Sequence, residues 1–115
     1  MTFTPGEQLS AEEVEERVDS TLENEEVVLF MKGTRMMPQC GFSQRALELI
    51  GKHRGDEFET VDVLDNLDAY REELSDHSGW ETIPQTYVDG EFIGGSDILA
   101  EMEERDELGE TLRTN

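Results

Sequence analysis

The chain has 115 residues, of which 29 are acidic and 9 are basic, so its formal net charge is −20. A surface this acidic repels nucleic acid phosphates and anionic membranes, which excludes both as partners. No apolar run approaches the ~20 residues that a membrane span needs, and the first residues lack the pattern of a signal peptide. The length suits one domain, which the sequence predicts over 1–115.

The composition also indicates the cellular setting. Only Lys32 and Lys52 are lysines, while the other basic residues are arginines, and this balance is typical of proteins from a very salty cytoplasm. At ~1 M salt the Debye length is about 3 Å, so self-repulsion is screened. An acidic protein from an ordinary cell is the alternative. Cys40 is the sole cysteine, which excludes an internal disulfide and favours the cytoplasm.

The hydrophobic pattern predicts the order α-β-α-β-α-β-β-α, with a short helix at the C-terminus. Ser10 and Glu13 form a capping-box pattern at the first helix, and the run over 27–31 predicts a strand buried on both faces. The predicted elements are helices over 10–24 and 41–53, a strand over 58–64, a helix from Leu67 to about Ser78, strands over 85–88 and 91–93, a helix over 96–102 and a short helix with Leu108 and Leu112.

A tight turn at Asp89-Gly90 joins the last two predicted strands into a hairpin. The two β-α units predict parallel pairing, while the hairpin adds antiparallel strands. We therefore expect a mixed sheet. Ser96 and Asp97 are predicted to cap the helix that follows the hairpin.

Cys40 lies where a loop meets the N-terminus of the predicted helix over 41–53. Unpaired backbone N–H groups and the positive end of the helix dipole favour a thiolate there. Residues 27–55 hold five bases and one acid, a charge of 5 − 1 = +4, in an otherwise acidic chain. Neighbouring cations lower a thiol pKa, so we interpret Cys40 as a reactive thiol or metal ligand. Lys52 and Arg54 can alternatively serve only the helix C-terminus.

The tetrapeptide Cys40-Gly41-Phe42-Ser43 matches the active-site motif of monothiol glutaredoxins. Four further pieces match in order: Met31-Lys32-Gly33, Pro38, Trp80 with Thr82-Ile83-Pro84-Gln85, and Gly94-Gly95-Ser96-Asp97 after Val88-Asp89-Gly90. The chain thus resembles the monothiol glutaredoxin family over about residues 12–112. The resemblance implies a thioredoxin-like α/β fold with a four-stranded mixed sheet flanked by helices.

The resemblance also implies how a glutathione-like thiol is bound. Lys32 would reach the thiolate and the anionic end of the tripeptide, although a solvated strand-end lysine is the alternative. The bond between Ile83 and Pro84 is expected to be cis, as in thioredoxin-like proteins, and the Ile83 backbone would pair with an incoming peptide as an added strand.

The second half of the implied thiol site follows the hairpin. Gly94-Gly95, followed by a helix that starts at Ser96, presents free N–H groups that suit a carboxylate, which makes Gly95 and Ser96 candidate binding residues. Asp97 suits the ammonium group of the ligand, with helix capping as the alternative. Arg71 aligns with a glutathione-contacting arginine of the family, with a solvated helix arginine as the alternative.

The motif Cys-x-x-Ser lacks a resolving thiol, so a mixed disulfide on Cys40 waits for an external thiol. A [2Fe-2S] cluster commonly takes four thiolates, and two chains with two small thiols supply four. Resemblance therefore implies a cluster carrier: a cluster-bridged homodimer when loaded, a monomer when empty, serving iron–sulfur recipient proteins. The alternative is an enzyme, a glutathione-dependent thiol–disulfide oxidoreductase that removes glutathione from proteins. A thiol-sensing interaction module is a third reading.

The chain also departs from the family or leaves a choice open at several positions. Ser96 replaces a cysteine that many relatives carry, and Glu81 stands where relatives often have proline. The loop pair Met36-Met37 is expected to pack, whereas Phe42 either packs inward or forms part of a docking surface. The two histidines, His53 and His77, lie at helix ends and predict no metal site.

Overall fold

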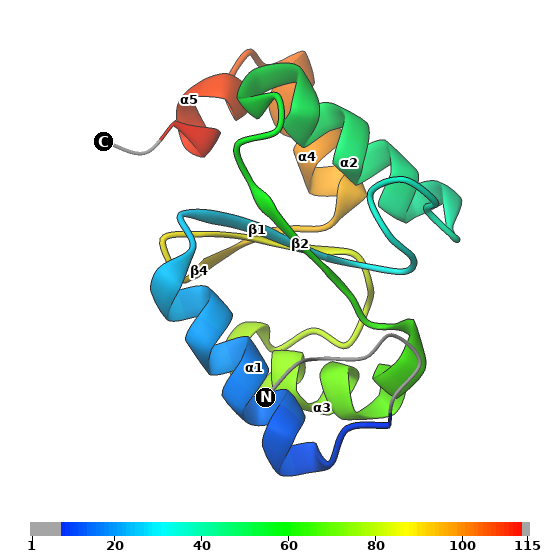
Figure 1. The fold of residues 1–115 in the computed structure, drawn as a ribbon. Coiled ribbons are helices and arrows are strands. Elements are labelled where there is room, and N and C mark those ends of the chain that lie inside the picture. Colours follow the sequence, from blue (N-terminus) through cyan, green and yellow to red (C-terminus); the bar gives the residue numbers. More distant parts are fainter. Residues whose placement is uncertain (1–7, 114–115) are drawn as a thin grey trace.

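A four-stranded sheet at the centre of the molecule separates two layers of helices (Figure 1). The computed structural model describes residues 8–113, so the outermost parts of the predicted domain, 1–7 and 114–115, lie outside the described residues. α1 (Ala11–Asn24) and α3 (Leu67–Ser78) cover one face of the sheet. α2 (Gly41–Arg54), α4 (Ser96–Glu104) and α5 (Leu108–Leu112) cover the other.

The sheet has the strand order β2-β1-β3-β4. β1 (Val27–Met31) pairs in parallel with β2 (Glu59–Asp62) and antiparallel with β3 (Gln85–Val88). β3 pairs antiparallel with β4 (Glu91–Gly94). The predicted mixed sheet is therefore confirmed. The turn between β3 and β4 places Asp89 at φ 51° and Gly90 at φ 80°, the two positive values that a tight hairpin turn requires.

β1 contributes to the hydrophobic cores on both sides of the sheet because its side chains alternate between the two faces. Val28 and Phe30 pack with α1 and α3, and the other three residues of the strand pack with α2, α4 and α5. All five are buried, which confirms the prediction of a strand covered on both faces.

The helix ends agree with the sequence at α1 and differ at α4. Ser10 caps α1 through the predicted capping box: its Oγ accepts from the Glu13 N–H at 3.1 Å, and the Glu13 carboxylate accepts from the Ser10 N–H at 3.0 Å. At α4 the N-cap is Gly95, with no side-chain cap. The prediction that Ser96 and Asp97 cap this helix is wrong, because the chain enters the helical conformation one residue earlier.

The second predicted strand, over 58–64, is shorter in the structure. Val63 donates its N–H to the Met31 carbonyl at 2.9 Å, and a short 3-10 helix, η1 (Leu64–Asn66), begins directly afterwards. The Asp62 carboxylate accepts the Leu64 N–H at 3.0 Å, so it turns the chain out of the sheet. Among the described residues, no helix combines the length and the apolar character needed to span a membrane.

Candidate functional site

Three segments of the predicted site meet at one end of the strands of the sheet. β3 runs against β1, so the end of β1 lies beside the start of β3, with Phe30 opposite Gln85. β4 runs against β3, and its last residue, Gly94, lies opposite Thr86. The strand order therefore brings together three residues that directly adjoin these strand ends: Lys32, Pro84 and Gly95.

Cys40 is the N-cap residue of α2 and is partly exposed. Burial raises the pKa of its thiol. Three influences together lower this pKa more: hydrogen bonds from the Ser43 and Phe42 N–H groups, the hydrogen bond of the Ser43 hydroxyl, and the charge of Lys32. The resulting pKa lies below the ordinary value of a cysteine. A Cβ added at Gly41 would meet nothing within 4 Å, so the space beside the thiol is open. The site therefore presents an accessible thiol whose environment favours the thiolate form.

Ser43, in the first turn of α2, links the thiol to the sheet. Its side chain is fully buried, and its Oγ accepts the Lys32 N–H at 3.0 Å. The same hydroxyl lowers the pKa of Cys40. One buried side chain thus sets the distance between the end of β1 and the start of α2.

The loop 33–39 is held at both ends by hydrogen bonds that its backbone N–H groups donate. Gly33 donates its N–H to the Asp62 carboxylate at 3.0 Å, and Gln39 donates to the Lys32 carbonyl at 2.9 Å. Gly33 has φ +93°, and a Cβ there would lie 2.5 Å from the Met37 carbonyl oxygen. Only glycine fits this position. The tight loop that it permits leads to Cys40, the N-cap residue of α2.

The peptide bond between Ile83 and Pro84 is cis, as the resemblance implied. A Cβ added at Gly95 would lie 3.1 Å from the Pro84 carbonyl oxygen. The backbone just before β3 and the backbone just after β4 therefore approach each other closely. The Gln85 side chain holds the preceding segment by donating to the Trp80 carbonyl at 2.7 Å and the Thr82 carbonyl at 3.2 Å.

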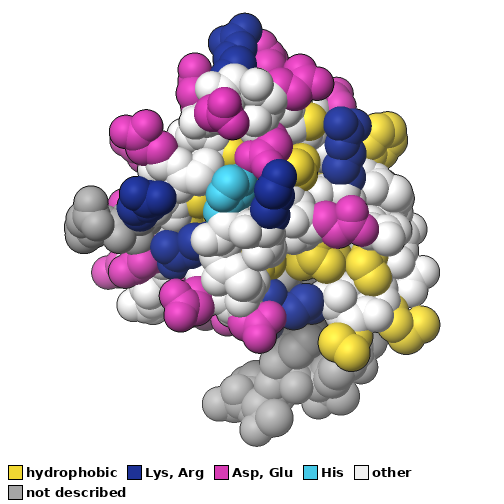
Figure 2. All heavy atoms as spheres, turned by 90° about the horizontal axis from the view of Figure 1, so that it is seen from above, with side chains coloured by type: hydrophobic (Ala, Val, Ile, Leu, Met, Phe, Trp, Pro, Cys, Tyr) yellow, Lys and Arg dark blue, Asp and Glu magenta, His cyan; other side chains and the backbone are white. Residues whose placement is uncertain are grey.

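Large apolar side chains are exposed in the cysteine loop, at the start of α2 and before the cis proline. Met36 is 88% exposed, Met37 66%, Phe42 61% and Trp80 58%. Seen over the α2, α4 and α5 layer, hydrophobic side chains gather on one side of the molecule, and charged side chains dominate elsewhere (Figure 2). The expectation that Met36 and Met37 pack is therefore wrong, and Phe42 faces solvent and not the core.

The comparisons with known proteins agree with this geometry. Residues 27–93 match the family model Glutaredoxin. The chain is 45% identical over 100 residues to the uncharacterized monothiol glutaredoxin ycf64-like of Synechocystis sp., covering 87% of this chain and 92% of that protein. It is 54% identical over 86 residues to the probable monothiol glutaredoxin GrlA of Legionella pneumophila, covering 75% and 94%. The chain belongs to the monothiol glutaredoxin family.

The fold of this glutaredoxin also matches solved structures. The solution structure of reduced poplar apo GrxS14 superposes with a TM-score of 0.73 at 39% identity, covering 86% of this chain and 89% of that one. The predicted thioredoxin-like α/β fold is therefore confirmed.

The predicted thiol-binding residues fall into two groups in the structure. One group, formed by Lys32, Ile83, Pro84, Gly95 and Ser96, extends adjoining strand ends, and Lys32 among them acts electrostatically on Cys40. Ser96 is buried, with 5% of its surface exposed. Asp97 lies in the first turn of α4.

Arg71 belongs to a different hollow. It lies on α3 and lines a pocket with Asp68, Glu72, Ser75, Asp76 and Glu81. This pocket joins α3 to the segment before the cis proline, and its lining does not include Cys40. Contact between Arg71 and a thiol ligand stays a prediction.

The positive block around Cys40 is only partly a property of the site. Within residues 8–113, Lys32 is the basic side chain whose charge lowers the thiol pKa. The Arg35 guanidinium instead lies over the Phe58 ring, 4.2 Å from its centroid, and donates to the Phe58 carbonyl. Lys52 pairs with Glu103 at 2.5 Å. The positive block therefore divides: Lys32 acts on the thiol, Arg35 contacts Phe58, and Lys52 and Arg54 lie in the last turn of α2, as the alternative for those two residues held.

Three positioning residues were not singled out by the sequence: Ser43, Asp62 and Gln85. Each is polar and makes a contact with a residue distant in the chain or with a neighbouring turn. Ser43 and Gln85 were quoted only as members of the matching motifs. The polar residues at positions 62 and 85, where one strand ends and another begins, are the signal that could have identified Asp62 and Gln85.

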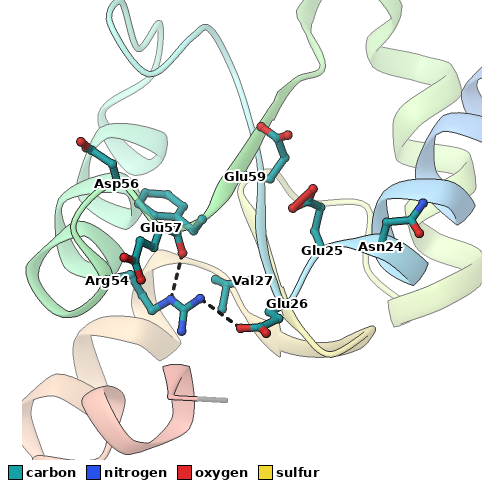
Figure 3. A pocket seen from close by; sticks show the side chains of 9 residues that line it. Asn24, Glu25, Glu26, Val27, Arg54, Asp56, Glu57 and Glu59 are labelled. Atoms are coloured by element: carbon teal, nitrogen blue, oxygen red, sulfur yellow. Dashed lines mark hydrogen bonds and ion pairs between the residues drawn. The ribbon is translucent and has the colours of Figure 1, made fainter. Parts of the chain in front are cut away.

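A pocket at the opposite end of the strands is separate from this site (Figure 3). It opens where β1 and β2 begin and is lined mainly by acidic side chains, together with Arg54. The Arg54 guanidinium donates to the Glu57 carbonyl at 3.0 Å and pairs with Glu26 at 3.4 Å, as Figure 3 shows. These contacts hold the end of α2 against the start of β1.

Proposed function

We propose that this glutaredoxin carries a [2Fe-2S] cluster as cargo and delivers it to iron–sulfur recipient proteins. The observation that supports the proposal most is the Cys40 thiol itself. Its pKa is lowered, it is accessible at the start of α2, and the sequence holds no second cysteine to compete for it. A thiolate is the form that ligates iron.

The donor set explains the stoichiometry that we propose. A [2Fe-2S] cluster commonly takes four thiolates, and this chain supplies one. Two chains and two small thiols complete the set, so the loaded form is a homodimer and the empty form a monomer. The open space at Gly41 and the exposed Phe42 suit the approach of a second chain.

A glutathione-like thiol would lie along the strand ends beside Cys40. Lys32 would attract its carboxylate, and the extended backbone at Ile83 would hydrogen-bond to it as an added strand. The free N–H groups at Gly95 and Ser96 suit a second carboxylate, and Asp97 would bind the ammonium group. Arg71 would act on the ligand only if it turns from its acidic pocket toward the thiol.

The lowered pKa of Cys40 also supports a second candidate, the removal of glutathione from protein thiols. The Cys40 thiolate attacks the glutathione sulfur of a mixed disulfide, and the protein thiolate leaves. A second glutathione thiolate then attacks the Cys40-bound glutathione, which restores Cys40 and releases glutathione disulfide. No resolving thiol speeds this release, so we favour the carrier.

Anaerobic reconstitution with iron, sulfide and glutathione tests the carrier role. Wild-type protein should gain visible charge-transfer absorbance and elute as a dimer, whereas Cys40→Ser should do neither. Absorbance retained in Cys40→Ser contradicts the proposal. Rapid turnover of a glutathione mixed disulfide, together with failure to hold a cluster, would identify the enzyme instead.

We also propose that the acidic surface is an adaptation to a salty cytoplasm. The charge of −20 and the scarcity of lysine support this setting. Growth-medium salt and fractionation of the source cells would test it: the protein should be found in the cytoplasmic fraction of an organism with high internal salt.

A further inference from the structure

His77 lies between two carboxylates that come from two different helices. Its Nε2 is 3.1 Å from the Asp19 Oδ1 of α1 and 3.1 Å from the Glu73 Oε2 of α3. Glu73 and His77 are one turn apart on α3, so they share a face of that helix. α1 and α3 cover the face of the sheet opposite α2, the helix that begins at Cys40 (Figure 1).

We propose that Asp19, Glu73 and His77 bind a divalent transition-metal ion such as Zn²⁺, which cross-links α1 to α3. One ligand atom from each residue lies within 4.8 Å of the other two. Zn²⁺ bonds to nitrogen and oxygen at about 2.0–2.2 Å, so two ligands of one tetrahedral ion lie ~3.4 Å apart. The 3.1 Å separations from Nε2 are close to that value, and the two carboxylate oxygens, within 4.8 Å of each other, would take up the same spacing around the ion.

The local charge favours a cation. Glu15, one turn before Asp19 on α1, also acts electrostatically on Glu73. Two carboxylates therefore contact one imidazole and a third acts on one of them, so the negative charges of the group outnumber the single positive charge that the imidazole can carry. The Glu73 side chain is only 14% exposed, so water compensates its charge poorly.

The nitrogen donor selects the kind of ion. Mg²⁺ and Ca²⁺ take oxygen ligands, whereas imidazole suits Zn²⁺ and its neighbours in the first transition row. The exposed side of the group, where Asp19 is 52% exposed, leaves room for water as the remaining ligand.

His53 provides the matched comparison within the same chain. It also contacts a carboxylate, Glu103, at 2.7 Å. There the Lys52 ammonium lies 2.5 Å from the other oxygen of Glu103 and already neutralises it. Substitution of His53 should therefore leave metal binding unchanged.

Calorimetric titration of the full chain with Zn²⁺, in a Cys40→Ser background that removes the thiol, tests the site. One Zn²⁺ per chain should bind and raise the midpoint of thermal unfolding. Asp19→Asn, Glu73→Gln and His77→Ala should each weaken binding at least tenfold, and His53→Ala should not. Mg²⁺ at the same concentration should not displace Zn²⁺.

Co²⁺ provides an independent readout, because its visible absorption reports the ligand set. The spectrum should appear in the Cys40→Ser background and disappear in Asp19→Asn, an exposed substitution that preserves the helix contact. Absence of one-to-one binding, equal binding in His77→Ala, or equal loss in His53→Ala would overturn the proposal. Since Cys40 is absent from these samples, the result is independent of the cluster role.

Discussion

At the scale of single residues, Ser43 connects the thiol to the end of β1. Its hydroxyl accepts the Lys32 N–H at 3.0 Å and also helps to lower the pKa of Cys40. Because Ser43 is fully buried, water does not replace either interaction. The fourth residue of the motif therefore acts through hydrogen bonding as well as through the absence of a second thiol.

Ser43→Ala should raise the pKa of Cys40 and destabilise the fold by about 1–3 kcal/mol, because the Lys32 N–H loses its buried acceptor. The rate of alkylation of the single cysteine as a function of pH measures the first effect, and denaturant unfolding the second. Ser43→Thr, which keeps the hydroxyl, is the control. An unchanged alkylation midpoint in Ser43→Ala would show that the hydroxyl does not act on the sulfur.

The lowered pKa of Cys40 also predicts how stability depends on pH. A group whose pKa is lower in the folded than in the unfolded chain stabilises the fold above its unfolded pKa. That contribution is lost as the pH falls through the folded pKa. Wild-type protein should therefore gain stability relative to Cys40→Ser on going from neutral to alkaline pH, measured by denaturant unfolding at each pH. A constant difference would indicate equal thiol pKa values in the two states.

At the scale of elements, the loop between β1 and α2 decides where the thiol lies. Gly33 enters it with φ +93°, and Asp62 at the end of β2 accepts the Gly33 N–H at 3.0 Å. The loop is therefore positioned by a neighbouring strand. The position of Cys40 thus depends on the register between β1 and β2.

Gly33→Ala should destabilise the protein by about 1–3 kcal/mol and slow the reaction of Cys40, because the added Cβ forces a strained backbone and meets the Met37 carbonyl. Gly51→Ala is a suitable comparison, since a Cβ there meets nothing within 4 Å. Gly51 lies inside α2, where alanine should stabilise by roughly 0.5–1 kcal/mol. Thermal unfolding of both variants measures the contrast, and equal midpoints would contradict the strained loop.

At the scale of the whole molecule, the charge of −20 opposes association of two chains. Exposed charges further apart than a Debye length are screened, and this length falls from ~10 Å at 0.1 M salt to ~3 Å at 1 M. The exposed apolar side chains near Cys40 would favour contact, while the acidic remainder of both chains opposes it at low salt.

The cluster-bridged dimer that we propose should therefore dissociate more readily as salt falls from ~1 M to ~0.1 M. Analytical ultracentrifugation of the reconstituted protein, with the visible absorbance followed in the same run, measures this. Sucrose at matched viscosity controls for effects other than screening. Dimer content that ignores salt would mean that the interface does not feel the net charge.

The sequence predicts much of the fold because its strongest signals are local. The continuous apolar run of β1, the capping box at Ser10 and the Asp89-Gly90 turn each specify structure within a few residues. Errors occurred at the ends of elements. The Asp62 carboxylate accepts the N–H groups of Leu64 and of the distant Gly33 and turns the chain out of β2, and the N-cap of α4 is Gly95, before the predicted caps.

The sequence by itself determined the family, the order of the elements and the one possible thiol, because motifs and periodicity are properties of neighbouring residues. Only the tertiary structure decided which charges act on that thiol. Arg35, near Cys40 in the chain, lies over Phe58, while Lys32 at the end of β1 acts on the sulfur. The tertiary structure also brings Asp19 into contact with His77, 58 positions away. Helix packing sets such distances, and spacing along the chain does not.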